Sequence, residues 1–127
     1  MTFRLMKVLL VEENSAIRGV MRQSLALPGI WIQECGNPVK AIAALAAGRA
    51  DFIIMDVGTN SLDGIAACER FKVMDPAVSV ILVSDYDDTV LRESAQRAGA
   101  CGYVLKDNLL ELKGLLTAFS TRGDGQA

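Results

Sequence analysis

Five side chains that could perform chemistry follow directly after apolar segments of this 127-residue chain. Glu12 and Glu13 follow the first such segment, and Asp56, Ser84 and Lys106 end three later ones. A buried strand does not normally finish on a carboxylate, so Asp56 could be a cap, a metal ligand or a nucleophile. If the segments are neighbouring parallel strands, which lie about 5 Å apart, the five side chains can reach a common point.

The charges of these groups favour a metal-assisted phosphoryl-transfer site. Three carboxylates in one crevice would raise one another's pKa unless a cation joined them, and a hard ion such as Mg²⁺ (or Mn²⁺) prefers oxygen ligands. A carboxylate held beside such an ion can attack phosphorus and form an acyl phosphate. Asp56 is the natural nucleophile because it ends the central strand. We therefore expect Asp56 to be phosphorylated, with Ser84 and Lys106 contacting the new phosphate.

The composition excludes several other kinds of chemistry. The chain has no histidine, which rules out histidine-dependent triads, histidine metal sites and a phosphohistidine carrier. Its net charge of -2, without a basic cluster, predicts no direct nucleic-acid binding by this segment. No apolar run approaches the roughly 20 residues of a membrane span. The three cysteines are an odd number and lack metal-ligand spacing. They are therefore expected to be small buried residues, as in a reducing, cytoplasmic location.

The segments that position the reactive groups alternate between strand and helix patterns. This alternation predicts an α/β fold, a five-stranded parallel sheet of flavodoxin-like order 2-1-3-4-5 with helices on both faces. We expect one domain over residues 1–120, with residues 121–127 as a tail or the start of a linker. The predicted strands are residues 7–11, 29–34, 51–56, 78–84 and 101–106, and the predicted helices are 15–27, 37–48, 64–75, 87–99 and 108–119.

Four motifs, taken in order, resemble the receiver domain of two-component response regulators. They are "VLLVEEN", "FIIMDV" with "LDG", "VILVS" and "GACGYVLKD", and the resemblance runs from about residue 7 to residue 119. It implies Mg²⁺ as cofactor. In the acidic pair that it implies, Glu13 is a metal ligand and Glu12 acts through water. Asp56 is the implied phosphoacceptor and a further metal ligand, and the carbonyl of Gly58 also binds the metal. The resemblance further implies that Ser84 is the switch hydroxyl, Tyr103 the switch aromatic ring and Lys106 the lysine that pairs with the phosphate.

The resemblance also implies partners. A sensor histidine kinase or phosphotransfer protein would supply the phosphoryl group in the cytoplasm. The segment "GYVLKD" is most similar to receivers that precede a helix-turn-helix DNA-binding domain, so such an output domain is expected outside this segment. A homodimer is compatible with this interpretation, and we expect no contact with a membrane. We expect a signalling domain rather than an enzyme, one that assists its own aspartyl phosphorylation and dephosphorylation.

Three residues depart from the family pattern and keep an alternative open. Glu13 carries one methylene more than the usual aspartate, which moves its carboxylate by about 1.5 Å and is expected to weaken or rearrange metal binding. Asn60 stands where proline is usual, and Asp85 adds negative charge at the mouth of the site. The alternative is a degenerate receiver that acts as a phosphorylation-independent interaction module. A flavodoxin-type FMN protein shares the fold, but the acidic segment after the first strand does not suit a flavin phosphate.

Overall fold

The computed structural model describes residues 5–57 and 61–125, and its five strands form one parallel sheet in the order β2-β1-β3-β4-β5. The predicted fold class and strand order are therefore confirmed. The strands are β1 (Met6–Val11), β2 (Ile30–Cys35), β3 (Phe52–Asp56), β4 (Ser79–Ser84) and β5 (Gly102–Leu105). The helices are α1 (Ser15–Ser24), α2 (Pro38–Ala47), α3 (Ser61–Met74), α4 (Thr89–Arg97) and α5 (Leu110–Gly125), with the short 3-10 helix η1 (Lys106–Asn108) before α5.

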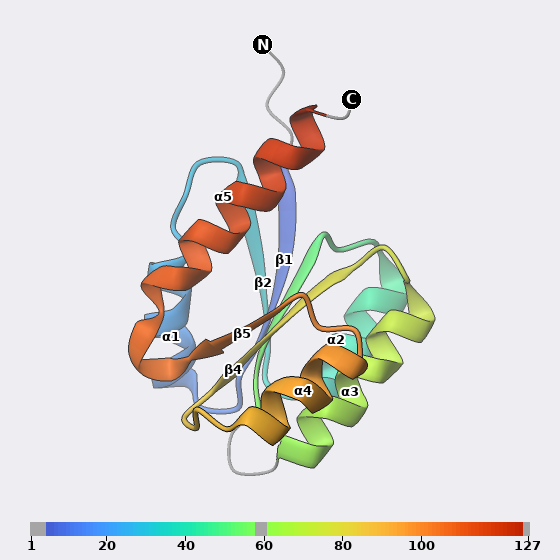
Figure 1. Cartoon of the computed structure of the whole chain (residues 1–127). Helices are drawn as coiled ribbons and strands as arrows, with labels where there is room; N and C mark the ends of the chain where they lie inside the picture. Colours follow the sequence, from blue (N-terminus) through green and yellow to red (C-terminus); the bar gives the residue numbers. More distant parts are fainter. Residues whose placement is uncertain (1–4, 58–60, 126–127) are drawn as a thin grey trace.

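Helices cover both faces of the sheet, α1 and α5 on one and α2, α3 and α4 on the other (Figure 1). The central strand β3 contributes side chains to the apolar clusters on both faces of the sheet. Phe52 and Ile54 join the apolar cluster that includes α1 and α5 side chains, whereas Ile53 and Met55 join the cluster beneath the other three helices. Every side chain of such a strand must be apolar whichever way it points, which explains the unbroken apolar run before Asp56.

Polar caps fix the starts of three helices near the carboxyl edge of the sheet. Asn14, Asn37 and Asp88 each accept hydrogen bonds from backbone N–H groups in the first turn of α1, α2 and α4. Two aspartates, Asp87 and Asp88, stand directly before α4. Asp88 caps the helix, and Asp87 forms an ion pair with Arg92 instead.

Three helix boundaries differ from the predicted ones by at least three residues. α1 ends at Ser24 rather than residue 27, because the N–H of Leu25 turns back to the carbonyls of Arg22 and Gln23. α3 begins at Ser61, three residues earlier than predicted. α5 continues to Gly125 instead of ending at residue 119, since no proline stops it and each glycine costs only about 1 kcal/mol. That residues 121–127 begin a linker stays a prediction.

Gly64 allows α3 to start close against the end of β3. A β-carbon built at Gly64 would lie 2.8 Å from Cβ of Val57 and would clash with Cγ1 of the same residue. Gly64→Ala is therefore expected to lower the free energy of unfolding by about 1–3 kcal/mol, as overpacking does. Gly19→Ala in α1 is the control, because nothing lies within 4 Å of its added β-carbon and helix propensity favours alanine. Urea unfolding of both variants measures this, and equal effects would contradict the close approach.

Candidate functional site

Asp56 and Lys106 form an ion pair at the carboxyl edge of the sheet. Nζ of Lys106 lies 2.7 Å from Oδ2 of Asp56, and the Asp56 side chain is only 1% exposed. Burial alone would lower the pKa of Lys106, but its hydrogen bond to Asp56 and the nearby negative charges outweigh burial, so that pKa lies above its usual range. The structure thus brings together the two residues that the sequence predicted as acceptor and phosphate partner.

Glu12 is the second carboxylate of this centre. Its side chain is buried, and its Oε1 accepts a hydrogen bond from the backbone N–H of Asn14 at 3.0 Å. Burial raises the pKa of Glu12, the Asn14 N–H lowers it, and the neighbouring Asp56 raises it again. The net shift is upward, mainly because the carboxylate is buried and to a smaller extent because Asp56 carries a like charge. A cation beside both carboxylates would relieve this cost.

A cleft of about 250 Å³ opens beside the ion pair. Its lining includes Glu12, Glu13, Asp56 and Asp63, so four carboxylate-bearing residues border one space. Asp63 was missed as a site residue, although it lies in the quoted "LDG" motif. Gly58, the predicted carbonyl ligand, lies outside the described residues.

The donor set of this cleft suits a hard divalent cation, which takes oxygen ligands. Within residues 5–57 and 61–125, no three Asp, Glu, His or Cys side chains are close enough to form a complete metal cage. Mg²⁺ needs no such cage, since it usually binds one or two carboxylates and keeps several waters. The oxygens of Glu12, Glu13 and Asp56 fit that requirement.

Ser84 ends β4, and Asp85 follows it and contacts Lys106 of the same centre. Ser84 is fully buried, and its Oγ accepts a hydrogen bond from the N–H of Tyr86 at 3.1 Å. Oδ2 of Asp85 lies 3.5 Å from Nζ of Lys106. Asp85 therefore competes with Asp56 for the lysine, a consequence of the departure seen in the sequence.

Tyr103, on β5, is joined to the same loop. Its hydroxyl donates to the carbonyl of Tyr86 at 2.7 Å. Tyr86 thus bonds Ser84 through its N–H and Tyr103 through its C=O. The sequence predicted the Ser84–Tyr103 pair but not this intermediary, because backbone hydrogen bonds carry no residue signature.

Arg18, on α1, contacts the backbone directly after β1. Its Nη1 donates to the carbonyl of Glu12 at 2.7 Å, and its Nε binds Glu34 on β2 at the same distance. Arg18 thus ties the end of β1 to the edge strand. This role could not be predicted from the sequence alone.

Comparison with known proteins agrees with this geometry. Residues 8–117 match the family model of the response regulator receiver domain, so the chain belongs to that family. It is 28% identical over 99 residues to the C4-dicarboxylate transport transcriptional regulatory protein DctD of Rhizobium meliloti, and 27% identical over 106 residues to the response regulator MprA of Mycobacterium avium. A response regulator receiver domain protein from Methanospirillum hungatei superposes with a TM-score of 0.84 at 18% identity, covering 97% of this chain and 99% of that one.

These matches define the chain as a receiver domain of two-component signalling. The DctD match covers 78% of this chain but 22% of DctD, and the MprA match covers 84% of this chain but 46% of MprA. The chain therefore spans less than half the length of these curated relatives. In the part of the chain that the structure describes, no helix has the length and apolar character needed to cross a membrane.

Proposed function

We propose that this receiver domain accepts a phosphoryl group on Asp56. The observation that carries the proposal is the 2.7 Å pair between Lys106 and the buried Asp56 at the end of the central strand. An Asp56 carboxylate oxygen attacks the phosphorus of the donor, the bond from phosphorus to the donor's nitrogen or oxygen breaks, and the leaving group takes a proton. Lys106 then pairs with the new phosphate oxygens, since an ammonium group stabilises charge that develops on them.

The metal ligands we propose are Glu13, Asp56 and the Gly58 carbonyl, with Glu12 acting through water. Support comes from the shared cleft, in which Glu12, Glu13 and Asp56 border one space. The pKa of Glu12 is raised mainly by burial and to a smaller extent by the neighbouring Asp56. When bound, Mg²⁺ or Mn²⁺ would neutralise negative charge on the acceptor and on the transferring group. Glu12 and Glu13 would orient the ion from the end of β1.

Glu13 is expected to limit metal affinity, because its additional methylene strains an octahedral site. Glu13→Asp should strengthen Mg²⁺ binding roughly threefold or more and speed phosphorylation at low Mg²⁺. Calorimetric titration and the phosphorylation rate with a small phosphodonor measure this, and EDTA should abolish incorporation in both proteins. Glu93→Asp on the exposed face of α4 makes the same deletion away from the cleft and should change neither quantity. Equal metal affinities for the Glu13→Asp and Glu93→Asp proteins would remove Glu13 from the ligand set.

The switch we propose couples Ser84 to Tyr103. Ser84 would move toward the phosphate, and the loop after β4 would follow it. The hydrogen bonds of Tyr86 to both residues support this coupling. The result would be a population shift of the surface made by α4, β5 and α5.

The phosphodonor we propose is a sensor histidine kinase or phosphotransfer protein in the cytoplasm. Relatives such as MprA are longer than this chain, which supports an output domain, with DNA binding as the proposed kind. A homodimer formed on phosphorylation fits the same scheme. The alternative, a phosphorylation-independent interaction module, is not favoured, because the chain matches the receiver-domain family and contains the Asp56–Lys106 ion pair.

A further inference from the structure

Arg92, in the first half of α4, contacts both the loop after β4 and the strand β5. Its Nε lies 2.8 Å from Oδ1 of Asp87 in that loop. Its Cζ lies 4.8 Å from the centre of the Tyr103 ring, and its Nη1 donates to the Tyr103 carbonyl at 3.4 Å. One side chain therefore joins the helix, the loop and the strand around the predicted switch ring. The proposed phosphoryl chemistry gives Arg92 no role.

The Tyr103 ring that Arg92 covers is connected to the phosphorylation centre. Its hydroxyl binds the carbonyl of Tyr86, and the N–H of Tyr86 binds Oγ of Ser84. A change in the ring position must therefore alter the residue that also holds the Ser84 hydroxyl. Because Oγ of Ser84 accepts this bond, its own proton remains available for a further acceptor such as a phosphate oxygen.

Packing alone does not fix the Tyr103 ring. The ring is only partly buried, and it borders an open groove of about 260 Å³ between α4 and β5, whose lining also includes Arg92, Gln96 and Gly102. The groove leaves room for other ring positions. Besides packing against the apolar cluster beneath α2, α3 and α4, the ring is held by the hydroxyl bond to Tyr86 and by the guanidinium group that lies over it.

We propose that Arg92 is a positioning residue that holds the Tyr103 ring against the Tyr86 carbonyl before any phosphoryl group arrives. The free chain then has the Tyr103 half of its switch already formed. A cation–π contact at a partly exposed site changes an equilibrium by about two- to fivefold. The Arg92–Asp87 pair adds little, because these side chains are 41% and 66% exposed. Arg92 therefore biases the ring position without locking it.

Fluorine NMR on the free protein tests the ring position directly. The chain has two tyrosines, so labelling with 3-fluorotyrosine gives two resonances, and Tyr86→Phe assigns them while keeping the Tyr86 carbonyl. Without Mg²⁺ or phosphate, Arg92→Ala should move the Tyr103 resonance toward that of free fluorotyrosine. Arg92→Lys should do so as well, since an ammonium group lacks the planar stacking surface. An unchanged Tyr103 resonance in Arg92→Ala would overturn the proposal.

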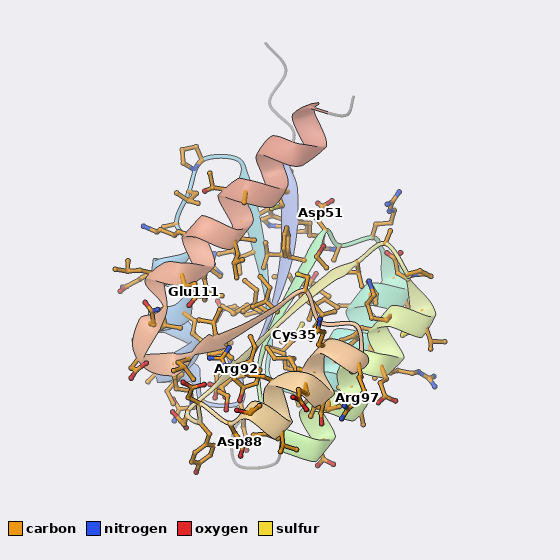
Figure 2. All side chains as sticks on the ribbon, in the orientation of Figure 1. Cys35, Asp51, Asp88, Arg92, Arg97 and Glu111 are labelled. Atoms are coloured by element: carbon orange, nitrogen blue, oxygen red, sulfur yellow. The ribbon has the colours of Figure 1, made fainter. Side chains whose placement is uncertain are left out.

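Arg97→Ala is the matched control. Arg92 lies in the first half of α4 and Arg97 is its last residue (Figure 2), and the Arg97 guanidinium donates a hydrogen bond to the Ser94 hydroxyl of its own helix. This variant removes the same charge from α4 and should leave the Tyr103 resonance in place. Equal shifts in Arg97→Ala and Arg92→Ala would mean that the resonance reports helix charge or stability, and would also overturn the proposal.

A second readout asks whether the ring position serves the switch, and this part rests on the proposed function. With Mg²⁺, Arg92→Ala should bind beryllofluoride about two- to fivefold more weakly than wild type, whereas Arg97→Ala should bind it equally well. A shifted resonance with unchanged affinity would show that Arg92 orders the ring without serving the switch, which contradicts the proposal. If wild type itself fails to bind beryllofluoride, the proposed function fails, and the NMR result still decides the ring position.

Discussion

Replacing Asp56 with asparagine is expected to abolish phosphate incorporation from a small phosphodonor in the presence of Mg²⁺. The amide has no anionic oxygen to attack phosphorus, so the rate should fall at least about a hundredfold. The change keeps the shape of a side chain that is 1% exposed, so the fold should persist. Radiolabelled or mass-spectrometric detection of acid-labile phosphate measures the result.

Asp63→Asn tests whether the loss of phosphate incorporation is specific to Asp56 or follows from any loss of negative charge in the cleft. Asp63 borders the same space but follows the start of α3 rather than a strand, and it is exposed. Incorporation should persist in this variant, with a change of less than about tenfold from lost negative charge. Loss in both variants alike would mean that the cleft acidity, and not Asp56, controls the reaction.

Replacing Lys106 with methionine is expected to destabilise the domain and to uncouple phosphorylation from the switch. Asp56 would remain buried after losing the ammonium group 2.7 Å away. Removing one partner of a buried pair costs about 3–5 kcal/mol, and the 23% exposure of Lys106 reduces this to about 1–3 kcal/mol. Urea unfolding in EDTA measures this loss.

Mg²⁺ should restore part of that stability in the Lys106→Met protein, because a bound cation replaces the missing positive charge beside Asp56 and Glu12. Lys40→Met, on the exposed start of α2, is the control, and it should change stability little in either buffer. If Lys106→Met unfolds at the same urea concentration as wild type in EDTA, the ion pair carries no stability and the account of the charge centre is wrong.

The fold could be predicted from the sequence because β1, β3 and β4 are buried on both faces and carry a clear signal. The apolar run before Asp56 is the best case, since no periodicity was needed to identify β3. The ends of the helices were harder to predict from the sequence. α1 stops at Ser24 through a backbone turn at Leu25, and α5 runs on to Gly125 past residues with weak helix propensity. Such boundaries depend on tertiary contacts that a single sequence does not show.

The site was predictable where it depends on strand order. Asp56, Ser84 and Lys106 each end a strand or begin the turn after it, so the topology alone brings them together. Arg92 and Tyr86 could not be found in this way, because one acts from a helix surface and the other through its backbone. The sequence showed Asp85 as a departure from the family pattern. Its contact with Lys106 was not predicted, because that contact depends on where the loop after β4 places the side chain.

The central claim is that Asp56 carries the phosphoryl group, and mapping the modified residue tests it most directly. The wild-type chain is incubated with Mg²⁺ and a small phosphodonor, the acyl phosphate is trapped by reduction, and the digested protein is sequenced by mass spectrometry. We predict one reduced aspartate, at Asp56, that is absent when EDTA replaces Mg²⁺ during the incubation or when hydroxylamine precedes the trapping. Label on any other residue, or no label on a folded, Mg²⁺-saturated chain, would contradict it.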